Sequence, residues 1–194
     1  MTLDAHTAVV DNDFINHLVE SRLDDTRLIA VLNIVFSDLG LTAVVHPLVY
    51  DNEVMHNHVR TKLLFQNQTV QKAEFSDIFQ GDANKQAYYI FLVTQLYRKL
   101  TGKVLPVSGN AVLSYWVRKN SLGEVHSISM CLICQSGIFL SDDGDSKELK
   151  KCVEQMALGK VDVYNRAEFF DKHMNEGINK IARTEKRSLT HTAK

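Results

Sequence analysis

Acidic side chains fall in four short segments of this sequence, next to apolar runs that have the character of buried elements. They are Asp11, Asp13, Glu53, Glu124, Asp142, Asp143 and Asp145. A buried carboxylate is costly unless it is paired or holds a cation, so carboxylates in such places usually have a function. Oxygen-rich clusters suit Mg²⁺ or Mn²⁺, hard cations that bind carboxylates and retain several waters. If the segments meet in the fold, the chain has the ligands for a divalent metal.

The chemistry open to such a cluster is phosphodiester hydrolysis. Carboxylates that crowd together without a cation repel one another, so a bound metal stabilises the cluster. With two ions roughly 3.5–4 Å apart, a site of this kind activates a water and stabilises the leaving oxygen. The alternative is structural, because a single acid at a helix N-terminus caps the helix or complements its dipole. Capping accounts for Asp11 or Asp13, and for Glu124 or Asp145, one at a time, but less well for all segments together.

The acids can meet only if the elements that carry them end at one place. Short apolar or β-branched runs predict strands at 8–10, 41–48, 138–140 and 161–164. Helical spacing is typical of 24–40, 51–65, 85–102, 122–137, 146–159 and 166–181, with a short helix containing Trp116 expected at 109–119. Strands that alternate with helices predict an α/β/α sandwich with a mainly parallel central sheet. Ligands bind beyond the carboxyl ends of such strands, where Asp11 and Asp143 stand.

The remaining segments have weaker patterns. Residues 66–84 are polar and are expected to form a loop with helical pieces. The chain from 183 to 194 lacks apolar periodicity and is basic, so we expect a flexible tail after a single domain at 1–182. His46 and His126 could line the expected cleft and contact phosphate, but a position in the core or on the surface is the favoured interpretation for both.

The overall charge excludes one class of nucleic-acid binder. A formal net charge of −1 argues against a chain that coats nucleic acid through bulk positive charge, but it leaves room for a local basic groove. No apolar run reaches the roughly 18 residues that a membrane span needs. The start, MTLDAHTAVVDND, lacks the pattern of a signal peptide. We therefore expect a cytoplasmic protein without a membrane partner.

Three cysteines invite a redox or zinc interpretation. Cys131 and Cys134 form a CxxC pattern inside the apolar stretch SISMCLICQSG, and Cys152 stands apart. A zinc site needs a second pair of ligands, and none is evident in the sequence. Free cysteine behaves as a small buried hydrophobe, so we expect core thiols in a reducing compartment.

Basic residues next to aromatic rings are the candidates for holding nucleic acid. Arg98 and Lys99 follow Tyr97, and the motif YWVRK contains Trp116, Arg118 and Lys119. This combination suits a single strand, because the cations contact phosphates and the rings stack on bases. The alternative, a solvated helix face plus a core tryptophan, remains open.

The order of the acidic segments resembles that of the PIN-domain family of small metal-dependent ribonucleases. VVDNDFI resembles the family's opening strand with its leading acid, here Asp11. HPLVYDNEV resembles the segment in which a proline is followed six residues later by the second acid, here Glu53. In GEVHSISMCLICQSGIFLSDDGD an acid opens a helix and a strand ends in a Ser/Thr-x-Asp element, which gives Glu124 and Asp143. The resemblance covers roughly residues 7–175.

The resemblance implies a PIN-like α/β/α sandwich that cleaves RNA through water activated by Mg²⁺ or Mn²⁺. It implies these catalytic residues: Asp11, Glu53, Glu124 and Asp143. It implies these metal ligands: Asp11, Glu124, Asp143 and Asp145, with Asp143 ranked ahead of Asp145 and Asp142 last. Asp13 is then a cap or a support for the ligands. The implied partners are RNA, a second copy in a homodimer, and an antitoxin-like protein inhibitor.

The sequence also departs from the family pattern. Asn12-Asp13 stands where Thr followed by Asn or Ser is commoner, and Glu124 occupies a position that is often Asp. The stretch 66–120 is longer than a compact member needs, so the resemblance predicts a helical insertion there.

Two other functions remain open. A PIN-like scaffold without catalysis would serve as a nucleic-acid or protein binding module. A haloacid-dehalogenase-like phosphatase would use Asp11 as nucleophile and Asp13 as general acid. Against the phosphatase, Phe14-Ile15 stands where that family has a Gly-Thr or similar pair, and no persuasive Ser/Thr and Lys pair follows.

Overall fold

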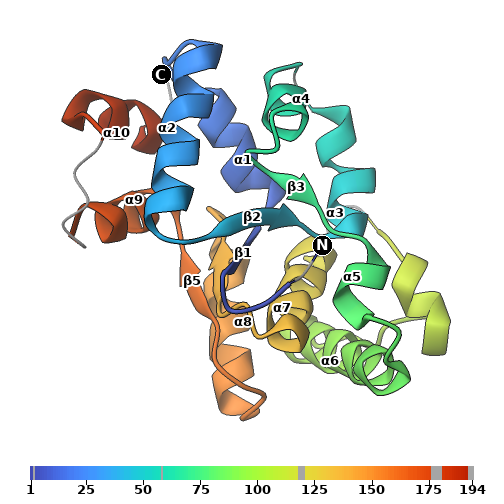
Figure 1. Ribbon diagram of the computed structural model, residues 1–194. Helices are drawn as coiled ribbons and strands as arrows, with labels where there is room; N and C mark the ends of the chain where they lie inside the picture. Colours follow the sequence, from blue (N-terminus) through green and yellow to red (C-terminus); the bar gives the residue numbers. More distant parts are fainter. Residues whose placement is uncertain (2, 58, 118–120, 176–180, 192–194) are drawn as a thin grey trace.

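Five short strands form one sheet, and every pair of neighbouring strands is parallel, in the order β3-β2-β1-β4-β5 (Figure 1). In this computed structural model the strands are β1 Thr7–Val10, β2 Thr42–Val45, β3 Gln71–Lys72, β4 Ile138–Leu140 and β5 Asp162–Tyr164. The structure describes the chain except residues 2, 58, 118–120, 176–180 and 192–194. The expected α/β architecture with a parallel sheet is confirmed.

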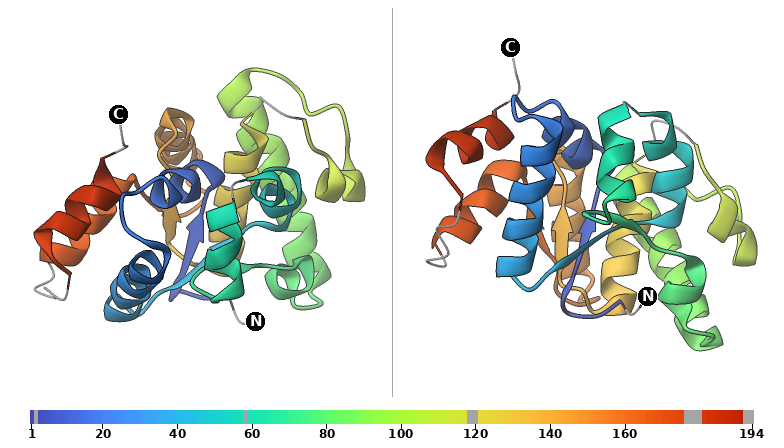
Figure 2. Two further views of the ribbon diagram at one scale, coloured as in Figure 1. Left: turned by 90° about the horizontal axis from the view of Figure 1, so that it is seen from above. Right: turned by 45° about the horizontal axis from the view of Figure 1, so that its top comes forward.

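Helices cover both faces of this sheet (Figure 2). The α-helices are α1 Asn12–Val19, α2 Asp25–Asp38, α3 Pro47–Asn52, α4 Val59–Gln66, α5 Phe75–Phe79, α6 Ala83–Thr101, α7 Leu122–Cys134, α8 Gly144–Gln155, α9 Arg166–Asn175 and α10 Arg183–Thr190. Two short 3₁₀ helices, η1 Val54–His56 and η2 Gly109–Ser114, complete the described elements.

Successive side chains of the central strand β1 point to opposite faces of the sheet, and helices bury them on both faces. Val9 joins a core with residues of α5, α6, α7 and α8. Ala8 and Val10 join a second core with residues of α1, α2, α4, α9 and α10. A short, continuously apolar strand is what a parallel sheet covered on both faces requires.

The expected helix at 51–65 is interrupted, and this correction matters for the site. The chain turns into α3 already at Pro47, because proline at the first helical position is preorganised and its missing N–H leaves no hydrogen bond unmade. The helix ends at Asn52, and Glu53 leaves helical geometry with φ −124° and ψ −60°. Residues that read as one helix therefore form α3, η1 and α4, and Glu53 stands at the first break.

The described part of the segment 66–120 contributes an edge strand and several helices to the fold. Its strand β3 pairs with β2 in parallel, which the polar sequence Gln71–Lys72 did not predict. Its long helix α6 buries Tyr89, Leu92 and Leu96 in the core shared with α7 and α8. The helix expected at 109–119 is shorter than predicted: η2 ends at Ser114, so Trp116 follows it.

The prediction of a flexible tail from residue 183 is wrong for residues 183–190, which form α10. This helix packs on α1 and α9 and buries Leu189 completely. Its Glu185 accepts a hydrogen bond from the Ala182 N–H at 2.8 Å and pairs with Arg27 of α2. Because tertiary contacts hold the helix, its sequence needs no apolar periodicity. Among the described helices, none has the length and apolar character needed to cross a bilayer.

Candidate active site

A pocket of about 370 Å³ opens where β1 and β4 end, and carboxylates dominate its walls. The acids that line it are Asp11, Asp13, Glu53, Glu124, Asp143 and Asp145. They come from the end of β1, the first turn of α1, the break after α3, the first turn of α7 and the start of α8. The fold thus brings all but one of the acids singled out from the sequence into one place, and Asp142 is the exception.

Asp11 lies at the back of this pocket and is only 3% exposed. Its backbone N–H donates to the carbonyl of Leu140 at 2.9 Å, which fastens the end of β1 to the end of β4. It occupies the N-cap position of α1, yet its side chain makes no capping hydrogen bond. Instead, the Ser141 hydroxyl donates to Asp11 Oδ2 at 3.1 Å. Helix capping therefore does not account for this carboxylate.

The electrostatics of the pocket reflect acids that crowd together out of water. Burial, and next the negative charge of Glu124, raise the pKa of Asp11 well above its ordinary value. Burial raises the pKa of Glu124 to about 7, with a further contribution from the charge of Asp143. Burial and Asp143 also raise the pKa of Asp13, which lies at the outer rim. A cation would remove this repulsion, which is the behaviour expected of a metal pocket.

Gly123 allows the first turn of α7 to approach the end of α3. A Cβ added at Gly123 would lie 3.3 Å from Cη2 of Trp116 and 3.5 Å from Cγ2 of Val49. The side chains of Trp116 and Val49 therefore pack directly against the backbone of Gly123. Gly123 and Ser121 also line the pocket, and the sequence did not predict them because neither residue type indicates a role without the fold.

The start of α8 separates the three acids of the motif SDDGD. Asp143 lines the pocket and also caps α8, because its Oδ1 accepts a hydrogen bond from the Asp145 N–H at 2.9 Å. Asp145 lines the pocket and accepts a hydrogen bond from the Ser121 hydroxyl at 2.5 Å. Each of these hydrogen bonds uses one carboxylate oxygen of Asp143 or Asp145, so the other oxygen of each acid can bind a cation.

Asp142 turns away to a different environment. Its Oδ2 lies 2.8 Å from Nδ1 of His17 and pairs with the Arg166 guanidinium. Its Oδ1 accepts a hydrogen bond from the Arg166 backbone N–H at 2.9 Å. These contacts tie α9 to the α1 side of the sheet, so Asp142 has structural partners and is not part of the described pocket lining.

The donor chemistry of the pocket fits a hard divalent cation. Every charged group on its described lining is a carboxylate, and oxygen is the donor that Mg²⁺ and Mn²⁺ prefer. Across the described residues, no three His, Cys, Asp or Glu side chains form a ready-made metal cage. Mg²⁺ does not require one, since it retains waters and is held by one or two carboxylates together with substrate phosphate.

The candidate nucleic-acid contacts are divided by the fold. Trp116 lines the acidic pocket, whereas Arg98 and Lys99 line a separate hollow with Gln95 and Met156. Arg118 and Lys119 lie outside the described residues. The three cysteines are free and buried, as expected of core thiols.

No protein-family model, curated protein or solved structure matches this chain. What defines its class is the fold itself: an α/β protein with a five-stranded all-parallel sheet flanked by helices. The acidic pocket at the carboxyl edge of that sheet is the feature from which a function can be argued.

Proposed function

We propose that this protein is a PIN-like endoribonuclease that uses Mg²⁺ or Mn²⁺ to hydrolyse phosphodiester bonds in RNA. The observation that carries the proposal is the convergence of six carboxylates from separate segments on one pocket at the carboxyl edge of the sheet. This edge is where parallel α/β sheets bind their ligands. Helix capping accounts for Asp143, but no capping hydrogen bond accounts for the buried Asp11.

The residues would divide the work as follows. The cation would be held by carboxylate oxygens of Asp11, Glu124, Asp143 and Asp145. When bound, Mg²⁺ or Mn²⁺ makes water more acidic and withdraws negative charge from a phosphate. Glu53 would orient the attacking water by accepting its hydrogen bond, and the Ser141 hydroxyl holds the Asp11 carboxylate in place. Trp116 would stack on a base of the strand at the rim of the pocket.

Two features weigh against the phosphatase alternative. A nucleophilic Asp11 would have to reach a phosphate, but this residue is only 3% exposed. The described lining of the pocket also has no lysine or arginine to balance a phosphate monoester. A polymeric substrate, by contrast, can be held through contacts outside the pocket.

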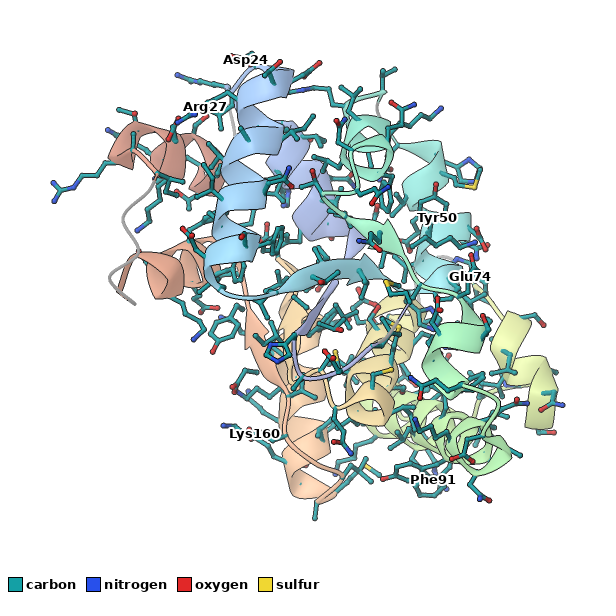
Figure 3. The ribbon with its side chains drawn as sticks, in the orientation of Figure 1. Asp24, Arg27, Tyr50, Glu74, Phe91 and Lys160 are labelled. Carbon is teal, nitrogen blue, oxygen red and sulfur yellow. The ribbon has the colours of Figure 1, made fainter. Side chains whose placement is uncertain are left out.

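The test is cleavage of a labelled single-stranded RNA with Mn²⁺ and with chelator. We expect the wild-type protein to cleave only with metal and the Asp11→Asn variant to be inactive. The matched control is Asp24→Asn, which removes the same charge at the start of α2 (Figure 3). Asparagine is as good an N-cap as aspartate, so this control keeps the fold.

Each outcome is informative about the proposal. Cleavage by Asp11→Asn at the wild-type rate would show that a contaminant or another site is responsible. Metal-independent binding of RNA without cleavage by any of the proteins would favour the binding module.

A further inference from the structure

The side chains of His46, Tyr89 and His126 form a linear hydrogen-bonded chain inside the protein. The hydroxyl of Tyr89 lies 2.7 Å from Nε2 of His46 and 2.6 Å from Nδ1 of His126. All three residues are 0% exposed. They come from different elements, because His46 is the N-cap of α3, Tyr89 belongs to α6 and His126 belongs to α7.

The partners fix the direction of every hydrogen bond in this chain. The Leu48 backbone N–H donates to Nδ1 of His46 at 3.2 Å, so the proton of this neutral ring is on Nε2. That Nε2–H donates to the Tyr89 oxygen, and the Tyr89 O–H donates to Nδ1 of His126. Burial lowers the pKa of His46 well below its ordinary value, so this ring is neutral at pH 7.

Such a chain is expensive to place in an apolar core. Burying an imidazole or a phenol hydroxyl costs free energy unless each polar atom finds a partner. His126 Nε2 makes no hydrogen bond of normal geometry among the described residues, and its weaker interaction is with the backbone of Tyr115. The rings of Phe75 and Phe79 pack against His46 and Tyr89, so the polar atoms of the chain lie among apolar side chains. Stability alone therefore does not account for the polar residues.

The helices that the chain joins are those that carry two acids of the pocket. Helix α3 follows its N-cap His46 and ends next to Glu53. On α7, Glu124 precedes His126 by two residues, and side chains two apart on a helix face different ways. Glu124 can therefore face the pocket while His126 faces Tyr89.

We propose that Tyr89 is a positioning residue, whose hydroxyl fixes α3 against α7 and thereby places Glu53 and Glu124 to complete the cation pocket. This inference rests on the proposed function. Helix α6 belongs to the segment 66–120, for which the sequence indicated no role. Under this proposal, α6 sets the geometry of the site. Tyr89 does not line the described pocket itself, so its effect must pass through the two histidines.

The first test compares Tyr89→Phe with Tyr97→Phe. Both substitutions remove one hydroxyl from a buried ring on α6, and Tyr97 lies outside the histidine chain. Mn²⁺ affinity is read from quenching of Trp116, the single tryptophan of the chain, and folding from thermal unfolding with chelator. We expect Tyr89→Phe to raise the Mn²⁺ Kd roughly 10-fold, as loss of a supporting residue does in other metal sites, and Tyr97→Phe to leave it within about 2-fold. Equal Kd values for the two variants would overturn the proposal.

A second pair decides the matter even if Tyr89→Phe does not fold. In His126→Asn the amide oxygen replaces Nδ1 as acceptor for the Tyr89 hydroxyl, whereas His126→Leu has a similar volume but no acceptor. We expect the asparagine variant to bind Mn²⁺ several-fold more tightly than the leucine variant. Indistinguishable affinities in this pair would contradict the positioning role.

The same titrations separate this inference from the function on which it rests. If the wild-type protein shows no Mn²⁺ quenching, the cation pocket and the positioning role both fail. If the wild type binds Mn²⁺, Asp11→Asn does not, and Tyr89→Phe binds as the wild type does, the pocket stands and only the role of Tyr89 is refuted.

Discussion

Gly123 and Glu53 meet across the candidate active site: a Cβ added to Gly123 would lie 3.8 Å from Oε1 of Glu53. The first turn of α7 thus presents bare backbone to the side chain that stands at the end of α3. The same added atom would press harder on Trp116, at 3.3 Å from its Cη2. Close approach of backbone to functional side chains is a use of glycine that no other residue fulfils here.

Replacing this glycine should disturb the pocket from within. We expect Gly123→Ala to displace the Trp116 ring, to shift its fluorescence emission and to lower stability by about 1 kcal/mol, as overpacking does. Gly144→Ala is the matched control, since it lies at the start of α8 with nothing within 4 Å of the added Cβ. Emission and unfolding measured for both variants check this. Identical behaviour of the two would refute a tight contact at Gly123.

Removing one carboxylate should stabilise the metal-free protein. Asp11 and Glu124 are buried near other acids, so neutralising either relieves both desolvation and repulsion. We expect Asp11→Asn and Glu124→Gln to raise the free energy of unfolding in chelator by about 1 kcal/mol or more at pH 7.5. Urea unfolding measures this, with Asp24→Asn as control. A drop in stability for both variants would mean that these carboxylates hold the fold together.

Mn²⁺ should act in the opposite way on the same proteins. A ligand that binds only the native state stabilises it, by about 2.7 kcal/mol at a hundred times its Kd. The wild type and Asp24→Asn should therefore gain thermal stability with Mn²⁺, and Asp11→Asn should gain little. A melting temperature of the wild type that stays constant in millimolar Mn²⁺ would argue strongly against the cation pocket.

The buried His46 should make the protein sensitive to mild acid. Burial, and then the nearby His126, lower the pKa of His46 well below its ordinary value of 6.5. As pH falls below 6.5, the unfolded chain takes up a proton at this position that the folded chain refuses. The stability that His46 contributes is therefore present above pH 6.5 and is lost below it, by up to about 1.4 kcal/mol per pH unit.

The comparison of wild type with His46→Asn isolates this effect from other titrating groups. Asparagine can still accept the hydrogen bond of the Leu48 N–H at the start of α3, so the cap survives. The difference in unfolding free energy, wild type minus variant, should shrink as pH falls from 6.5 to 5.5. A difference that stays constant over that range would show that His46 titrates normally in the folded state.

RNA binding should depend on Trp116 and not on the basic end of α6. Trp116 lines the acidic pocket, whereas Arg98 and Lys99 line another hollow. Base stacking on an aromatic ring is worth about 1–3 kcal/mol, so Trp116→Leu should weaken single-strand binding roughly 5- to 150-fold. The double variant Arg98→Gln, Lys99→Gln should stay within about 2-fold. Both are measured by anisotropy of labelled RNA in the Asp11→Asn background, and the reverse ranking would place the strand on α6.

The convergence of the acids was predictable from the sequence for a physical reason. Asp11 and Asp143 each follow an apolar run, and parallel strands end at one edge of their sheet. The departure of Asp142 was not predictable, because its partners His17 and Arg166 are 125 and 24 residues away in the chain. Asp142 and Asp143 are adjacent and chemically identical, so only the contacts that the fold creates give them different roles.

Other features were hidden for similar reasons. Strand β3 consists of Gln71–Lys72, and a two-residue polar edge strand has no apolar pattern to read. The helix breaks at Glu53 through a change of backbone dihedral angles, and the residues on either side have a composition typical of helices. Tyr89 is 43 residues from His46 and 37 from His126, so nothing local connects the three.

The origin of the oxygen in the cleavage products tests the central claim most directly. RNA cleaved by the wild type with Mn²⁺ in ¹⁸O-labelled water should give products with one labelled oxygen on the new terminal phosphate, because water is the nucleophile. Asp11→Asn should give no such product. Products that end in unlabelled 2′,3′-cyclic phosphate, or labelled products formed equally well by Asp11→Asn, would contradict a metal-assisted hydrolysis at this pocket.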